Sequence, residues 1–209
     1  AGVANIVTGP GHTVGARMAE HPDVDLVSFT GGLVSGTKVA DAAAPGVKKV
    51  ALELGGKNPN VVFADACATA DGFDTAVDQA LNAAFIHSGQ VCSAGARLIV
   101  EESVRDRFVA ELARRAGRIR LGRGTEEGVE CGPLVSAQQR AKVEAYVESA
   151  LQEGAVLRCG GKRPEPSAER PEAGYFFEPT VLDRCHREMR VAREEVFGPV
   201  LTVETFRTE

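Results

Sequence analysis

The chain has 209 residues, of which 44% are hydrophobic and 25% are charged, and this composition is typical of a globular protein with a buried core. With 24 basic and 29 acidic side chains, a net charge of −5 and only 5% aromatic residues, it lacks the features of a nucleic-acid-binding protein. It has no apolar run near the ~20 residues of a membrane-spanning helix, and since its first residues lack a basic segment followed by an apolar core, we expect no signal peptide. We therefore expect a cytoplasmic protein without a membrane partner.

The cysteine pattern indicates free thiols. Five cysteines are present, at Cys67, Cys92, Cys131, Cys159 and Cys185, and none of them forms a Cys-x-x-Cys pair. An odd number without paired spacing argues against a disulfide framework or a zinc ribbon. The four histidines form no cluster with metal-ligand spacing, so no metal site is predicted.

The first 55 residues are predicted to form β-α-β pieces. A short strand is expected at residues 5–7 and a helix over 13–21. Two further strands are expected at 26–29 and 50–54, and a pair of glycines follows each of them at a short distance. Glycine pairs of this kind end regular elements.

The remaining residues alternate between strands and helices. The clearest helix carries apolar residues at three- and four-residue steps from Phe73 to Phe85, the period of a buried helical stripe. Two more helices are predicted to be capped by Ser103 and Ser136. Strands are predicted at 60–64, 97–100, 155–159, 175–182 and 200–206, and a solvated loop at 162–174. This alternation predicts an α/β fold with a layered, mostly parallel sheet.

Cys92 is the first candidate for chemistry. It lies between Gly89 and Gly95, after the buried helix and before a strand, where glycines let a ligand approach the backbone. A thiol becomes a nucleophile only as an accessible thiolate. The alternative is a small buried side chain, which is the usual state of a free cysteine.

Glu53 is the second candidate. It is expected near the end of the strand at 50–54, on the face opposite Leu52 and Leu54 and just before Gly55. A carboxylate that is partly desolvated there would have a raised pKa and could act as a general base. A solvated strand face is an equally good reading.

Glycine-rich turns are the third candidate. Gly9, Gly11 and Gly15 approach the dinucleotide fingerprint Gly-x-Gly-x-x-Gly but miss it, because position 14 is Val14. A plain strand-to-helix turn would have the same residues.

Together these segments resemble the aldehyde dehydrogenase superfamily. Residues 52–59 (Leu-Glu-Leu-Gly-Gly-Lys-Asn-Pro) resemble its glutamate motif, residues 85–97 its cysteine motif, and residues 194–200 (Glu-Glu-Val-Phe-Gly-Pro-Val) a cofactor-facing segment. Weaker matches at 29–32 and in the Gly9 to Gly15 turn occur in the same order. The resemblance extends over nearly the whole chain. Residues 66–72 are several residues longer than the resemblance implies, which predicts a surface bulge there.

The resemblance implies that Cys92 attacks an aldehyde to form a thiohemiacetal, which becomes a thioester as hydride leaves for a nicotinamide. Glu53 would then activate the water that releases a carboxylic acid. The backbone N–H of Cys92 would be one oxyanion donor. The implied cofactor is NAD, with NADP not excluded.

The cofactor-binding residues that the resemblance implies come from both ends of the chain. Glu195 would hold the nicotinamide ribose, and Phe197 would lie near the nicotinamide. The remaining positions, along the phosphates and the nicotinamide, are Gly9, Gly15, Thr30, Gly31, Gly32 and Leu54.

The resemblance also implies a domain organisation. Residues 1–55 would be the C-terminal part of a Rossmann-like NAD(P)-binding domain, and 56–209 a thiol-bearing catalytic domain truncated at its C-terminus. The implied missing parts include the oxyanion-hole asparagine, the adenosine-ribose site and the oligomerisation arm. We therefore expect an inactive fragment of a homodimeric or homotetrameric enzyme.

Within the family, residues 87–95 and 174–180 look most like betaine-aldehyde dehydrogenases, which implies betaine aldehyde as the small-molecule substrate and glycine betaine as the product. Another amino- or aliphatic aldehyde is the alternative. Two other readings stay open from the residues alone. One is a cysteine hydrolase or acyltransferase with His87 as the base, and the other is a non-catalytic relative.

Overall fold

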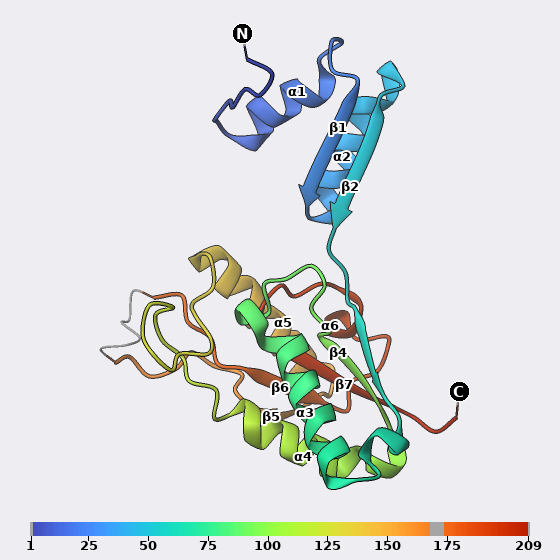
Figure 1. Ribbon diagram of the computed structural model, residues 1–209, viewed down its shortest axis with the longest axis vertical. Helices are drawn as coiled ribbons and strands as arrows, with labels where there is room; N and C mark the ends of the chain where they lie inside the picture. Colours follow the sequence, from blue (N-terminus) through green and yellow to red (C-terminus); the bar gives the residue numbers. More distant parts are fainter. Residues whose placement is uncertain (1, 168–173, 209) are drawn as a thin grey trace. The chain divides into compact units, whose positions relative to one another are not determined.

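The computed structural model describes residues 2–167 and 174–208 and divides into two compact units, Ala1–Gly55 and Gly56–Glu209 (Figure 1). Each unit is described by itself. Part of the loop predicted at 162–174 falls outside the described residues. No helix of the described residues is long and apolar enough to cross a membrane.

The first unit is a parallel β-α-β arrangement. In chain order its elements are η1 (Gly11–Gly15), α1 (Ala16–Glu20), β1 (Leu26–Gly31), α2 (Leu33–Ala43), η2 (Ala44–Gly46) and β2 (Lys49–Leu54). β1 and β2 pair in register from Leu26↔Lys49 to Gly31↔Leu54. α2 packs closely on β2, because a Cβ at Gly36 would lie only 2.7 Å from Cδ2 of Leu54.

The strand predicted at residues 5–7 is wrong. These residues are irregular, with Ile6 93% and Val7 69% exposed. A strand needs a hydrogen-bonded neighbour, and in the described part of this unit the sheet consists of β1 and β2 alone. An apolar run therefore does not form a strand when no neighbouring strand is present to share its backbone hydrogen bonds.

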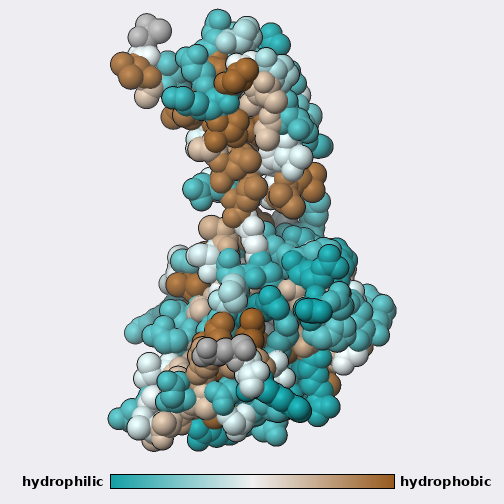
Figure 2. Space-filling view, turned by 90° about the vertical axis from the view of Figure 1, so that its right-hand side faces the viewer, coloured by the Kyte–Doolittle hydropathy of each residue, from teal (hydrophilic) through white to brown (hydrophobic). Residues whose placement is uncertain are grey.

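The first unit leaves much apolar surface uncovered (Figure 2). Its buried apolar side chains in the described part are those of Ala19 and Ala43. Its large exposed apolar residues are Val3, Ile6, Val7, Met18, Leu26, Leu33, Val34, Val47, Val50 and Leu52. Apolar exposure on this scale is unusual for the free surface of a monomeric protein.

The second unit contains a five-stranded sheet in the order β3-β4-β7-β6-β5. The strands are β3 (Pro59–Val62), β4 (Arg97–Glu101), β5 (Val156–Cys159), β6 (Thr180–Asp183) and β7 (Val200–Phe206). All neighbouring pairs are parallel except β5 with β6. The expected α/β fold with a mostly parallel sheet is confirmed.

Helices cover both faces of this sheet. They are α3 (Ala70–Phe85), α4 (Glu102–Ala116), α5 (Ala137–Gln152) and the short α6 (Arg190–Arg193). One core cluster joins α3 and α4 to Val181 and Leu201, while a second joins α5 and α6 to Leu182 and Val200. Neighbouring residues of β6 and β7 thus face opposite cores, as the two-residue period of a strand requires.

Of the two helix caps predicted, at Ser103 and Ser136, one agrees with the structure. α5 begins as expected, because Ser136 Oγ accepts a hydrogen bond from the Gln139 N–H at 3.1 Å. Ser103 is not a cap: α4 already begins at Glu102, and Ser103 Oγ donates to the Glu101 carboxylate at 2.7 Å. A free acceptor is what capping requires.

The surface bulge predicted at residues 66–72 stays a prediction, and five of these seven residues are exposed. The segment forms the turn η3 (Ala64–Cys67) and the first turn of α3. Cys67 is 2% exposed, and Arg107 donates a 2.5 Å hydrogen bond to its carbonyl. The segment therefore consists of two helical turns joined by a short bend at residues 68–69.

The strand predicted at 175–182 is shorter than expected. β6 begins only at Thr180, directly after Pro179, although Phe176 and Phe177 are buried in the irregular segment before it. Proline cannot donate to a strand ladder, which explains why the apolar run does not extend the strand.

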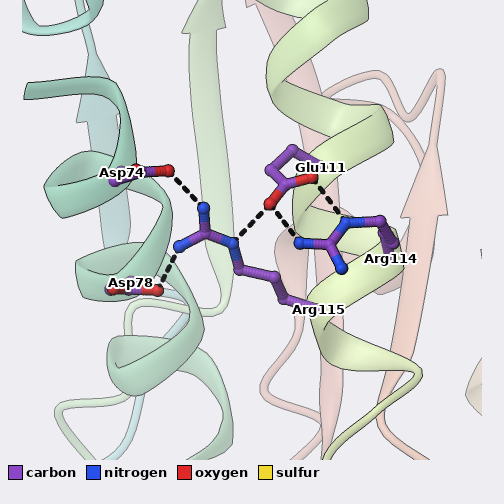
Figure 3. A network of polar contacts seen from close by, with 5 residues as sticks. All are labelled: Asp74, Asp78, Glu111, Arg114 and Arg115. Carbon is purple, nitrogen blue, oxygen red and sulfur yellow. Dashed lines mark hydrogen bonds and ion pairs between the residues drawn. The ribbon is translucent and has the colours of Figure 1, made fainter. Parts of the chain in front are cut away.

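A charged network joins α3 to α4 (Figure 3). Arg115 bridges Asp74, Asp78 and Glu111, with 2.6 Å contacts to the latter two, and Arg114 contacts Glu111 at 2.5 Å. Hydrogen bonds from Arg114 and Arg115 lower the pKa of Glu111 to about 2. The network fixes the two helices that lie over the first core cluster.

Candidate active site

Cys92 lies in the turn between η4 (Ile86–Gly89) and β4, and it is the exposed one of the five cysteines. Cys67, Cys131 and Cys185 are buried and Cys159 is half-buried. Burial raises the pKa of Cys159 to about 11 and that of Cys185 to about 12. Because reactivity belongs to an accessible thiolate, the nucleophile proposed from the sequence has the exposure that the role requires.

The turn before the thiol has an unusual backbone. His87, Ser88 and Gly89 have φ angles of 51°, 60° and 67°, in the left-handed region that favours glycine. A Cβ at Gly89 would lie 2.2 Å from the Gly198 carbonyl oxygen. The cysteine motif therefore contacts the segment at 194–200 backbone to backbone.

Replacing Gly89 by alanine is expected to destabilise the full-length protein by more than about 2 kcal/mol, because the left-handed backbone and the clash with Gly198 add together. Chemical denaturation measures the change. Gly124 has open space around the position of a Cβ, so Gly124→Ala serves as the control and should stay within about 0.5 kcal/mol. Equal stabilities of the two variants would contradict the close packing of Gly89.

Asn58 holds the thiol turn from the other side. Its Nδ2 donates to the Cys92 carbonyl at 2.7 Å and to the Ala94 carbonyl at 3.3 Å, and its own carbonyl accepts from Arg97 N–H at 3.2 Å. The end of the glutamate motif thus fixes the peptide that carries the thiol. Asn58 has no role predicted from the sequence, although it lies in the glutamate motif at residues 52–59.

Glu195 and Phe197 lie between α6 and β7, and both are half-buried. Burial raises the pKa of Glu195, opposed by Lys142, by a hydrogen bond from the Gly56 backbone and by Lys57. Phe197 has a φ of 55°. Both residues therefore lie in the segment 194–200, whose Gly198 contacts Gly89 in the thiol loop, by which we mean residues 87–94.

Lys57 is half-buried, and its Nζ is buried with no hydrogen-bond partner among the described residues. Burial lowers its pKa from 10.5 to about 8, and Arg97 acts in the same direction, while Cys185, Glu204 and Glu195 oppose the shift. An unpaired buried ammonium destabilises a fold, so Lys57 marks a place where stability is lost.

Lys57→Met is expected to stabilise the full-length protein by about 1–3 kcal/mol at pH 7. Since the folded pKa is about 8 and the ordinary value is 10.5, the unfolded chain binds more protons between these pH values. Wild-type stability should therefore rise across that window, and the variant should lack the rise. Denaturation from pH 7 to 10.5 measures both.

Lys38 is exposed, and the control Lys38→Met should change stability by less than about 0.5 kcal/mol. If Lys57→Met is no more stable than Lys38→Met, the prediction is contradicted.

In the first unit, the structure brings together the candidates from the ends of β1 and β2. Thr30 pairs with Glu53, and Gly31 pairs with Leu54. Glu53 and Thr30 are exposed, and α2 begins directly after Gly32. Ligands of open parallel sheets bind at the carboxyl ends of the strands, and helix N-termini attract phosphates.

Gly9 and Gly15 belong to a different element, the π-helical turn η1 and the residues before it. A Cβ at Gly9 would lie 2.4 Å from Cγ2 of Val14, whereas one at Gly15 would meet nothing within 4 Å. Packing therefore explains a glycine at position 9 and gives no reason for one at position 15.

His87 does not form a nucleophile–base pair with Cys92. Its side chain is exposed, and no hydrogen bond of the described residues joins its ring to the thiol. Nor does the described part of the chain contain a group of His, Cys, Asp and Glu side chains that could hold a metal ion. The arrangement supports thiol chemistry without a histidine base beside it.

Comparison with known proteins gives matches over the whole chain. The sequence model of the aldehyde dehydrogenase family matches residues 1–209. The chain is 58% identical over 209 residues to the betaine aldehyde dehydrogenase of Bacillus subtilis, covering 100% of this chain and 41% of that protein. It is 47% identical over 208 residues to a peroxisomal aminoaldehyde dehydrogenase of Pisum sativum, covering 40% of that protein.

Solved structures give the same result. A betaine aldehyde dehydrogenase from Staphylococcus aureus, crystallised in complex with NAD+, is 48% identical and matches with a TM-score of 0.91. The match covers 97% of this chain and 39% of that one. The chain thus spans about 40% of the length of the relatives it matches.

Proposed function

Because the chain belongs to the aldehyde dehydrogenase family, we propose that the whole protein oxidises an aldehyde to a carboxylic acid with NAD+ as the acceptor. The observation that carries this proposal is the exposed Cys92 turn, which Asn58 holds and which packs through Gly89 against Gly198, close to Glu195. The proposed nucleophile and the proposed cofactor-facing segment thereby lie in contact with each other.

In the proposed reaction, the Cys92 thiolate adds to the aldehyde carbon, and the electron pair of the carbonyl bond moves to the oxygen, which gives a thiohemiacetal anion. The Cys92 N–H donates to the oxygen that becomes negative. NAD+, when bound, accepts the hydride that leaves this carbon, and the product on the thiol is a thioester. Glu53 takes a proton from water, which attacks the thioester and releases the acid.

The residues present fit the cofactor. The Glu195 carboxylate is half-buried and receives a backbone hydrogen bond from Gly56, and a carboxylate suits the two hydroxyls of a ribose. Thr30 and Gly31 are the last two residues of β1, and Gly32 lies directly before α2, a place that suits a phosphate. Leu54 lies beside them in the sheet, and Phe197 supplies a ring for the nicotinamide. Gly9 and Gly15 remain proposed phosphate-side positions.

The proposed substrate is betaine aldehyde, with glycine betaine as the product. The Bacillus subtilis and Staphylococcus aureus proteins named above support it, while the Pisum sativum protein supports an aminoaldehyde as the alternative. NAD+ is proposed over NADP+ because the Staphylococcus aureus protein was crystallised with it.

The proposal is tested on the full-length protein by following NADH formation with betaine aldehyde, an aminoaldehyde and an aliphatic aldehyde, each with NAD+ and with NADP+. We expect the highest kcat/KM for betaine aldehyde with NAD+. A higher value for the aminoaldehyde would replace the substrate, and no turnover of any aldehyde would overturn the function.

The units have proposed roles within that protein. Residues 1–55 would be the end of the NAD(P)-binding domain and 56–209 most of the catalytic domain, and the boundary falls between the two units of the structure. We also propose a cytoplasmic homodimer or homotetramer. For location, the names of plant relatives give the peroxisome and the chloroplast as alternatives.

A further inference from the structure

Gln139, on the first turn of α5, holds the segment that contains Phe197. Its side-chain Nε2 donates to the Val196 carbonyl at 2.9 Å and to the Phe197 carbonyl at 2.8 Å. Its own backbone N–H is bound by Ser136 Oγ at 3.1 Å. The Gln139 amide therefore holds two successive carbonyls, and the second belongs to Phe197, whose φ is 55°.

The segment just before α5 holds the thiol loop. Gln90, two residues before Cys92, accepts a hydrogen bond from Val135 N–H at 2.9 Å, and its Nε2 lies 3.5 Å from the Pro133 carbonyl. Ser88 Oγ donates to the Gly132 carbonyl at 2.8 Å. Three contacts thus join residues 132–135 to residues 88–90.

These contacts form a closed arrangement. Residues 132–139, which we term the α5 bracket, contact the thiol loop at one end through Gln90 and the Phe197 segment at the other through Gln139. The two held segments also contact each other directly, since a Cβ at Gly89 would lie 2.2 Å from the Gly198 oxygen. A capped helical turn is a stiff spacer.

We propose that the α5 bracket sets the position of the Cys92 turn relative to the Phe197 segment, with Gln90 and Gln139 as positioning residues for hydride transfer. This rests on the proposed function, in which the carbon held by Cys92 must face the nicotinamide beside Phe197. A misplacement of about 1 Å between reacting groups can slow a reaction about 100-fold.

The two glutamines affect different steps. Gln139 holds the cofactor-facing side, so its loss slows hydride transfer and leaves the thiol turn in place. Gln90 holds the thiol loop, so its loss also impairs reactions that need only the thiol. Hydrolysis of an activated ester, 4-nitrophenyl acetate, requires acylation and deacylation of Cys92 and no hydride transfer, and it therefore separates the two effects.

The test uses the full-length enzyme with Gln139→Met and Gln90→Met, which keep length and remove the amide. Gln138→Met is the matched control, because Gln138 is the exposed neighbour on the same turn. Aldehyde oxidation is measured with ordinary aldehyde and with aldehyde deuterated at C1, and ester hydrolysis is measured without NAD+. Gln139→Glu, which cannot donate to the two carbonyls, is a second variant should Gln139→Met fold poorly.

For Gln139→Met we expect kcat for oxidation to fall about 10- to 100-fold, a larger deuterium isotope effect on kcat, and ester hydrolysis within about threefold of the control. For Gln90→Met we expect both activities to fall. Gln139 variants that behave like Gln138→Met, or that lose both activities equally with no change in isotope effect, would overturn the proposal. Failure of the proposed function is distinct, because the wild-type enzyme itself would then oxidise no aldehyde.

Discussion

Cys92→Ala in the full-length protein is expected to abolish aldehyde-dependent NADH formation, with kcat falling by about 10⁴-fold or more. The sulfur forms the bond that holds the substrate through hydride transfer, and no other side chain can replace it. The four remaining cysteines do not compensate, since they are buried or half-buried. Alanine leaves the turn intact, because its supporting hydrogen bonds involve the backbone carbonyls of Cys92 and Ala94.

The measurement is NADH absorbance under saturating aldehyde and NAD+, with thermal unfolding as a check on the fold. Cys159→Ala is the matched control, because it removes a half-buried thiol in β5 whose pKa burial raises to about 11. We expect the control to keep most of the activity. Unchanged turnover by Cys92→Ala would end the mechanism proposed for this thiol.

Regular elements with a strong local signal could be predicted from the sequence. The apolar stripe from Phe73 to Phe85 predicts α3, and Ser136 predicts the start of α5. Local patterns fail where the outcome depends on a distant partner. Residues 5–7 have the composition of a strand, yet no strand of the described residues pairs with them.

In the candidate site too, local motifs predict some residues, whereas contacts between distant positions decide the others. Motifs identify Cys92 and Glu195, because each lies in a recognisable run of residues. The contacts that support them link positions far apart in the chain: Asn58 to Cys92, Gln90 to Val135, and Gln139 to Phe197. Nothing in the residues around Gln139 indicates that its side chain will meet the Phe197 carbonyl, 58 positions later. Only the three-dimensional fold reveals these positioning residues.

The second large effect is expected from Glu53→Gln, which should separate hydride transfer from hydrolysis. Glutamine keeps the size of the side chain and cannot accept a proton from water. The first turnover should therefore still yield about one NADH per active site, because thiohemiacetal formation and hydride transfer do not use this base in the proposed mechanism. Steady-state turnover should fall about 10²- to 10⁴-fold, the usual contribution of a general base.

Rapid mixing of the full-length Glu53→Gln enzyme with aldehyde and NAD+ measures the burst and the steady state in one experiment. Glu53 is exposed at the end of β2, and Glu20 is an exposed carboxylate at the end of α1 in the same unit. Glu20→Gln is therefore the matched control and should show wild-type turnover.

A variant at position 53 that turns over normally would show that another group activates the water. A variant that yields no burst would place Glu53 before hydride transfer, as a base that activates the Cys92 thiol. Because the burst amplitude counts thioesters formed and the steady state counts thioesters hydrolysed, the two readings assign Glu53 to a single step.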